Sequence, residues 1–139
     1  MELMTKILKY WLPVVLWAIV IFSFSSGRVP SASPVYWQDF VAKKMAHVIE
    51  YGFFAFLLYR ALRAYGSSKT QAGTLTVIIA ALYGGSDEIH QIFTQGRESN
   101  IRDVVFDTIG ATLGVYFIWK LLPKAPKKLK KLLASLQLE

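Results

Sequence analysis

Three apolar segments of this chain carry polar side chains at helical spacing, and these are the residues that could do chemistry. Each set falls on one face of a helix, with its members three, four or seven residues apart: Lys44, His47 and Tyr51; Asp87 and Gln91; Asp103 and Asp107. Imidazole and carboxylate groups serve as general acids and bases, whereas ammonium, amide and phenol groups hydrogen-bond to a ligand. The pattern predicts a polar site, with His47, Asp87 and the neighbouring Glu88 as candidate acid–base residues.

The spacing gives little support for a metal ion or a serine nucleophile. No His-Glu-x-x-His motif occurs, and Asp87, Glu88, His90 and Gln91 spread around a helix instead of sharing one face. Ser86 and His90 are four residues apart, but a nucleophile and its base also need a third orienting group and an oxyanion site. We therefore expect no bound metal and no cofactor.

Residues 94–100 form a short polar loop that brings a guanidinium group to the same region. Arg97 follows Gly96 in this loop, and a planar guanidinium binds a carboxylate or a phosphate through two parallel hydrogen bonds. We therefore add Arg97 to the predicted ligand-binding residues. These also include Glu88 and the seven residues of the three helical faces.

The composition indicates what surrounds this site. Of 139 residues, 54% are apolar and 18% are charged, against about 45–50% and about 25% in an average soluble domain. The high hydrophobicity argues against disorder, and long uncharged runs argue against a nucleic-acid-binding domain despite the net charge of +7. The lack of cysteine excludes a disulfide scaffold and any zinc or iron–sulfur site held by thiolates.

Four apolar stretches approach the roughly 20 residues that a helix needs to span the hydrocarbon of a bilayer. They predict a single-domain, all-α, integral membrane four-helix bundle, with spans near residues 8–25, 43–64, 70–93 and 102–122. The first stretch has a second interpretation, because Lys6 and Lys9, a short apolar run and Ser25-Ser26-Gly27 are also typical of a cleaved signal peptide. Its bulky Trp and Phe side chains favour a retained helix.

The basic residues orient the predicted bundle. One set of helix ends carries 11 basic and two acidic residues, a charge of +9, and the other carries five basic and seven acidic residues, a charge of −2. Because basic loops stay on the cytoplasmic side, we expect both termini in the cytoplasm. The polar ends of the second, third and fourth spans then lie together on the extracytoplasmic side of the membrane.

Two pairs of glycines indicate close helix contacts. Gly110 and Gly114 are four residues apart in the last span, where small residues let a neighbouring backbone approach. Gly84-Gly85 precedes the polar end of the third span. This pair predicts either close packing or a kink that opens a polar pocket.

Residues 123–139 predict a basic amphipathic tail. The leucines of this segment fall at i, i+3, i+4 and i+7, and lysines fill the opposite face: Leu129, Leu132, Leu133 and Leu136 form the apolar side. Such a helix lies on anionic lipid, where each lysine contributes about 1 kcal/mol. We expect the tail to anchor the chain to the membrane surface.

In this order and spacing, the motifs resemble those of the VanZ-like membrane protein family. The resemblance covers about residues 10–120 and rests on Lys44-x-x-His47-x-x-x-Tyr51, Asp87-Glu88-x-x-Gln91, Gly96-Arg97 and Asp103-x-x-x-Asp107-x-x-Gly110. Where this chain has Asp107, the family often has Asn. The resemblance implies a bacterial protein of the cytoplasmic membrane, in a family whose named member is associated with resistance to teicoplanin-type glycopeptide antibiotics.

Three functions are compatible with these residues. In the first, a pocket facing the outer leaflet binds or modulates a lipid-linked cell-wall precursor or a lipid-tailed glycopeptide. In the second, the carboxylates and histidines serve as acid and base, or hold a metal ion, in a membrane-embedded hydrolase or transferase acting on an envelope lipid. In the third, the cations only neutralise the carboxylates in a structural network without a ligand: Lys44, Arg97 and Arg102 against Asp87, Asp103 and Asp107.

Overall fold

The computed structural model describes residues 2–27, 30–96, 99–124, 126–127, 130–131 and 134. The main helices are α1 (Glu2–Ser25), α2 (Tyr36–Ala64), α3 (Lys69–Ile92) and α4 (Ile101–Tyr116), and α4 continues into the short helices η1 (Phe117–Leu121) and η2 (Leu122–Lys124). These described residues contain no β-strand. The predicted all-α class with four main helices is therefore confirmed.

Two of the helices begin earlier than their apolar runs. The predicted spans begin at residues 8 and 43, whereas α1 begins at Glu2 and α2 at Tyr36. The added turns contain charged residues, among them Lys6 and Asp39. A hydrophobic run ends at the first charges, but a helix needs only its own backbone hydrogen bonds to continue. The bounds of α3 and the start of α4 lie within one residue of those predicted.

Three helical segments are long and apolar enough to cross a membrane: Leu3–Ser25, Tyr36–Ala64 and Ile101–Lys124. The prediction of four such spans is therefore confirmed for three of them. The remaining helix, α3, has 24 residues and sufficient length, but it is not among the apolar spans. Its last two turns carry Asp87, Glu88, His90 and Gln91, and these polar residues lower the mean hydropathy of an otherwise apolar helix.

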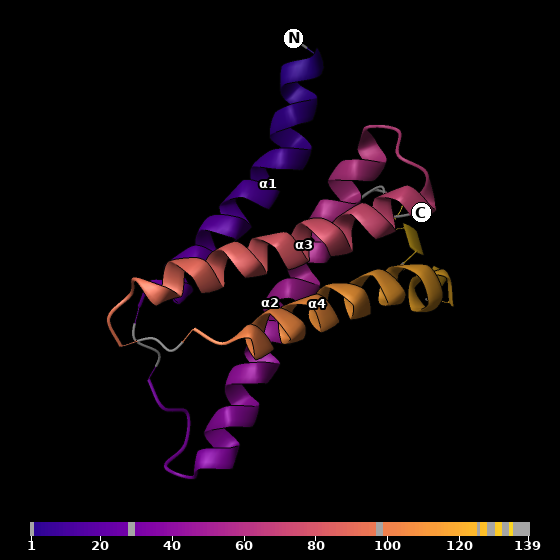
Figure 1. Ribbon diagram of the computed structural model, residues 1–139. Helices are drawn as coiled ribbons and strands as arrows, with labels where there is room; N and C mark the ends of the chain where they lie inside the picture. The colour runs from indigo at the N-terminus through magenta and orange to yellow at the C-terminus, as the bar shows by residue number, and fades with distance from the viewer. Residues whose placement is uncertain are drawn as a thin grey trace.

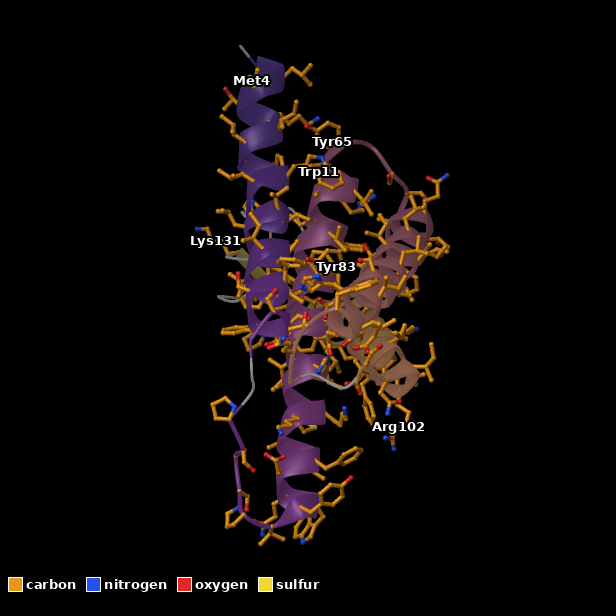
Figure 2. All side chains as sticks on the ribbon, turned by 60° about the vertical axis from the view of Figure 1, so that its left-hand side comes forward. Met4, Trp11, Tyr65, Tyr83, Arg102 and Lys131 are labelled. Carbon is orange, nitrogen blue, oxygen red and sulfur yellow. The ribbon has the colours of Figure 1, made fainter. Side chains whose placement is uncertain are left out.

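The helices form two antiparallel pairs (Figure 1). α1 runs opposite to α2 and α3 runs opposite to α4, with the second pair lying obliquely across the first. α2 supplies much of the core through Tyr51, Phe54 and Leu58, against which Val14 and Ile21 of α1 pack. The first turns of α1 and the first turns of α2 extend beyond the other helices at opposite ends of the molecule (Figure 2).

Glycines allow α4 to contact the backbone of α2. A β-carbon at Gly110 would lie 2.5 Å from the carbonyl oxygen of Val48, and one at Gly114 would lie 2.7 Å from the carbonyl oxygen of Gly52. Both distances are shorter than any side chain tolerates, so only glycine fits at these two positions. The predicted close packing along Gly110-x-x-x-Gly114 is confirmed, and it fixes the register between the two helices that carry most of the charged pairs.

The predicted amphipathic tail falls mostly outside the described residues. None of its four apolar leucines is among them. Within the part that is described, the backbone N–H of Lys130 donates to the carbonyl of Pro126 at 3.0 Å, a spacing of four residues that is typical of a helix.

Candidate functional site

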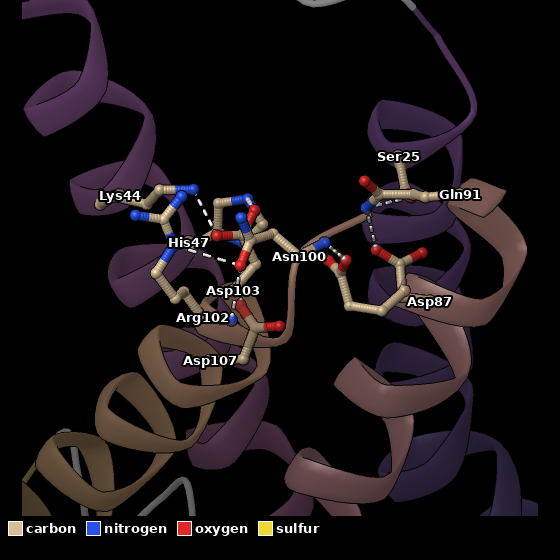
Figure 3. Close-up of polar contacts among 10 residues, drawn as sticks. Ser25, Lys44, His47, Asp87, Gln91, Asn100, Arg102, Asp103 and Asp107 are labelled. Atoms are coloured by element: carbon tan, nitrogen blue, oxygen red, sulfur yellow. Dashed lines mark hydrogen bonds and ion pairs between the residues drawn. The ribbon is translucent and has the colours of Figure 1, made fainter. Parts of the chain in front are cut away.

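Polar ends of four helices meet at one end of the bundle (Figure 3). The alternating helix directions bring the first half of α2, the last turns of α3 and the first turns of α4 together, as expected. α1 adds Ser25, its last residue, which the sequence analysis did not place in the polar site. The contacts form two groups, one between α2 and α4 and one between α1 and α3.

The first group consists of two charged pairs between α2 and α4. Lys44 Nζ contacts Asp103 Oδ1, and His47 Nδ1 lies 2.8 Å from Asp107 Oδ1. His47 Nε2 lies 4.0 Å from Asp103 Oδ2, so the imidazole stands between both carboxylates. Since Lys44 already has a carboxylate partner, its charge is largely neutralised within the protein.

Asp107 is the most deeply buried of these charged groups, with a side chain only 1% exposed. Gly84 of α3 makes room for it, because a β-carbon there would lie 2.7 Å from Asp107 Oδ2. Of the two alternatives for Gly84-Gly85, this contact supports close packing at Gly84. A β-carbon at Gly85 would meet nothing within 4 Å.

The second group links α1 to α3 through an amide. Gln91 Nε2 donates to Ser25 Oγ and to Asp87 Oδ2, each at 3.0 Å. Asp87 and Gln91 are one helical turn apart, which is why both side chains reach the same side of α3. The amide therefore fixes the position of the Asp87 carboxylate with a neutral donor, whereas a cation holds Asp103.

Glu88 faces the loop between α3 and α4. The backbone N–H of Asn100 donates to Glu88 Oε2 at 2.6 Å, and Ser99 Oγ donates to the backbone carbonyl of Glu88 at 2.9 Å. Asn100 in turn caps α4 by accepting a hydrogen bond from the N–H of Arg102 at 3.1 Å. In this position Glu88 holds the start of α4 in place, and it is not part of the cavity wall.

A cavity of about 370 Å³ lies between the two groups. Its wall combines apolar and polar residues from all four helices. The wall includes Ile21, Phe24 and Ser25 of α1, Lys44, His47, Glu50 and Tyr51 of α2, Asp87 and Gln91 of α3, and Asp103 of α4. Six of the nine residues predicted to bind a ligand therefore line one cavity. Asp107 lies behind His47 and supports it from the core.

Two polar atoms of the cavity wall lack a hydrogen-bond partner among the described residues. They are the hydroxyl of Tyr51 and Oδ1 of Asp87, and their residues are only 1% and 5% exposed. A buried polar atom left without a partner costs about 1–3 kcal/mol. Both atoms therefore keep the capacity for one more hydrogen bond, the carboxylate oxygen as an acceptor and the phenol as a donor or acceptor.

Three further residues of the sequence analysis are Arg97, Ser86 and His90. Arg97 lies outside the described residues. Ser86 Oγ donates to the carbonyl of Tyr83 at 2.7 Å, while His90 Nε2 lies 3.1 Å from Ser26 Oγ, so Ser86 and His90 do not form a nucleophile–base pair. In the part of the chain that the structure describes, no group of three or more His, Asp or Glu side chains is placed to hold a metal ion.

Comparison with known proteins identifies the family. A family model described as VanZ/LLP1 matches residues 7–123, a range that includes all four main helices from the second turn of α1 onward and every residue of the cavity wall. No curated protein and no solved structure matches the chain. The match covers most of the sequence and agrees with the resemblance of the polar motifs, and the chain thus belongs to the VanZ/LLP1 family.

Proposed function

We propose that this protein binds the polar headgroup of an amphiphilic cell-envelope molecule at the extracytoplasmic side of the bacterial cytoplasmic membrane. The observation that carries the proposal is a cavity lined by six of the nine predicted ligand-binding residues, two of which, Tyr51 and Asp87, also carry a buried polar atom without a partner among the described residues. A network that only closed the end of the bundle would pair these atoms with each other or replace them with apolar side chains. Charge neutralisation accounts for Lys44 and Asp103, but it leaves Asp87 and Tyr51 unexplained.

Helix lengths support a site at the membrane boundary. Lys44 lies 16 residues before Arg60 in α2, and Asp87 lies 18 residues after Lys69 in α3, which correspond to about 24 and 27 Å along a helix. The hydrocarbon core of a bilayer is about 30 Å thick. If the basic ends lie in the cytoplasmic interface, the cavity lies just inside the opposite interface, where a headgroup and the first part of a lipid chain meet.

The orientation of the chain in the membrane is part of the same proposal. The basic excess at one end supports both termini in the cytoplasm, and α3 then crosses the membrane between α2 and α4. Its polar last turns do not prevent this, because Asp87 and Gln91 are buried in the bundle and make hydrogen bonds there.

The cavity favours a ligand that is rich in hydrogen-bond donors. Lys44 is occupied by Asp103, while Asp87 offers an ionisable oxygen and Tyr51 a hydroxyl. Sugar hydroxyls and amines are the complementary groups. A lipid-linked cell-wall precursor carries such groups next to a lipid chain, and so does a lipid-tailed glycopeptide of the teicoplanin type. The apolar side chains of Ile21 and Phe24 beside the polar wall suit the start of that chain. Arg97, in the neighbouring loop, would bind a phosphate or carboxylate of the same ligand.

A second candidate function, acid–base catalysis on the same ligand, is favoured by the His47–Asp107 pair. His47 lines the cavity, and the buried carboxylate of Asp107 orients its imidazole through a 2.8 Å contact. A histidine held in this way by a carboxylate can act as a general base. A chemically altered form of the ligand recovered from the cavity would support this function.

Photo-crosslinking in cells tests the proposal. We replace Phe24, which lines the cavity, with p-benzoylphenylalanine and identify the attached molecules by mass spectrometry. As a matched control, the same amino acid replaces Leu82, which is exposed on α3 away from the cavity. We expect one class of amphiphile with a sugar or amine headgroup at position 24 and bulk phospholipids at position 82. The same phospholipid mixture at both positions would contradict the proposal.

A further inference from the structure

Basic and aromatic side chains gather at the other end of the α1–α2 pair. Lys9 of α1 lies next to Arg60 near the end of α2, and Lys6 lies over the ring of Tyr65, which follows α2. Figure 2 shows Tyr65 beside Trp11 of α1 at this end. We call Lys6, Lys9, Tyr10, Arg60 and Tyr65 the basic–aromatic cluster. It lies far from the cavity described above, because α1 separates Lys9 from Ser25 by 16 residues, about 24 Å along the helix.

Two cations of the cluster share one aromatic ring. Lys9 Nζ lies 5.2 Å and the guanidinium carbon of Arg60 lies 4.7 Å from the centre of the Tyr10 ring. Arg60 Nη1 also donates to the backbone carbonyl of Lys9 at 3.5 Å. Lys6 Nζ lies 5.0 Å from the centre of the Tyr65 ring, whose edge contacts Trp11. The rings therefore hold three positive charges close together, on side chains that keep some or most of their surface exposed.

Basic residues outnumber acidic ones along the neighbouring sequence. Residues 2–12 and 58–72, which form this end of α1, α2 and α3, contain five lysines and arginines and one acidic residue, Glu2, so their net charge is +4. Like charges held near one another repel, and the repulsion is relieved when an anion binds between them. Phosphate is an anion that both a guanidinium and ammonium groups bind well.

The first two turns of α1 indicate that this anion belongs to a lipid. Leu3, Met4, Ile7 and Leu8 are exposed and form one side of the helix, while Lys6 and Lys9 lie on another. A helix with this pattern lies with its apolar side among acyl chains and its lysines at the level of the headgroups. Free phosphate would meet only the lysines and would leave the apolar side uncovered.

We infer that the basic–aromatic cluster is a binding site for the phosphate headgroup of an anionic phospholipid, such as phosphatidylglycerol. The acyl chains of that lipid lie along the exposed apolar side of α1. The site is separate from the proposed headgroup cavity and does not depend on its function.

Lipid binding to the full-length protein in a neutral detergent tests this inference. Native mass spectrometry counts the bound lipids when phosphatidylglycerol or phosphatidylcholine of equal chain length is added. We expect the wild type to bind phosphatidylglycerol at least about tenfold more tightly than phosphatidylcholine. Equal binding of both lipids by the wild type would overturn the inference without the use of any variant.

Two variants of equal charge locate the site. The first combines Lys6→Gln, Lys9→Gln and Arg60→Gln, and the second combines Lys69→Gln, Lys120→Gln and Lys124→Gln at the same end of α3 and α4. We expect about tenfold weaker binding of phosphatidylglycerol by the first and less than about threefold weaker binding by the second. Equal losses would show unspecific charge attraction. Displacement of the lipid by an equal concentration of inorganic phosphate would show a site for the free anion, and either result would overturn the inference.

Discussion

Replacing Asp107 with alanine should lower the free energy of unfolding by about 3 kcal/mol, because it removes one partner from a buried pair. Asp107 is almost fully buried and its Oδ1 lies 2.8 Å from His47 Nδ1. Without the Asp107 carboxylate, the largely buried imidazole loses its 2.8 Å partner and keeps only Asp103, at 4.0 Å, as a neighbouring carboxylate. Asp107→Asn keeps an oxygen at the same position and should lower the free energy of unfolding by about 1 kcal/mol or less. A small effect of Asp107→Asn on stability would also agree with the Asn that the family often has at this position.

A double-mutant cycle with His47→Ala measures the pair itself. Unfolding in mixed micelles with increasing dodecyl sulfate gives the free energies of the wild type, both single variants and the double variant. We expect the two substitutions to be coupled by about 1–3 kcal/mol, since neighbouring residues in one network rarely add. Additive losses, within about 0.5 kcal/mol, would show that the 2.8 Å contact contributes little to stability.

Asp87→Asn should weaken ligand binding by about 10–100-fold while the protein still accumulates in the membrane. The substitution keeps the shape of the side chain and an acceptor for Gln91, but it removes the negative charge. A hydrogen bond to a charged group contributes about 1.5–3 kcal/mol, which corresponds to this range. The affinity is measured by raising the ligand concentration and recording how much ligand crosslinks at position 24.

The matched control is Asp39→Asn. Asp39 loses the same charge at the same end of α2, but it pairs with Lys43 at 2.7 Å and is not part of the cavity wall. We expect its ligand affinity to stay within about threefold of the wild type. If both variants lose affinity equally, the effect is one of net charge at this end of the bundle. If Asp87→Asn instead fails to accumulate, the carboxylate has a structural role.

The positions of the four helices could be predicted from the sequence because apolar runs and spacings of three and four residues are local signals. Gly110-x-x-x-Gly114 likewise predicted a close contact, and α4 touches the backbone of α2 there. The convergence of the polar ends followed from alternating helix directions. Predicting these features does not require knowing which side chains of different helices contact one another.

The partners of the charged groups could not be predicted in the same way. The sequence left open whether Lys44 contacts a ligand or one of three carboxylates. It contacts Asp103 on α4, because a buried cation needs an anionic partner. Glu88 follows Asp87 directly, and consecutive residues of a helix point about 100° apart. Glu88 therefore contacts the loop at Asn100 while Asp87 faces the cavity. Pairing across helices depends on tertiary geometry that helical spacing alone does not contain.

The predicted membrane character of α3 also shows where hydropathy is insufficient. α3 is not among the helices that are apolar enough to cross a membrane, but Asp87, Glu88 and Gln91 in its polar turns are buried in the bundle. Mean hydropathy assigns a cost to every polar side chain, whether it faces lipid or a hydrogen-bonding partner. A helix whose polar residues all face the bundle can cross a membrane with a lower mean hydropathy.

Cysteine labelling in intact cells tests most directly whether the cavity opens to the extracytoplasmic side. The chain has no cysteine of its own, so single cysteines report unambiguously. Gly27→Cys lines the cavity with free space around its β-carbon, and Gln95→Cys and Ser67→Cys lie at opposite ends of α3. We predict that a membrane-impermeant maleimide labels positions 27 and 95 in intact cells and position 67 only after permeabilisation. Labelling of position 67 from outside, with positions 27 and 95 protected, would contradict the account.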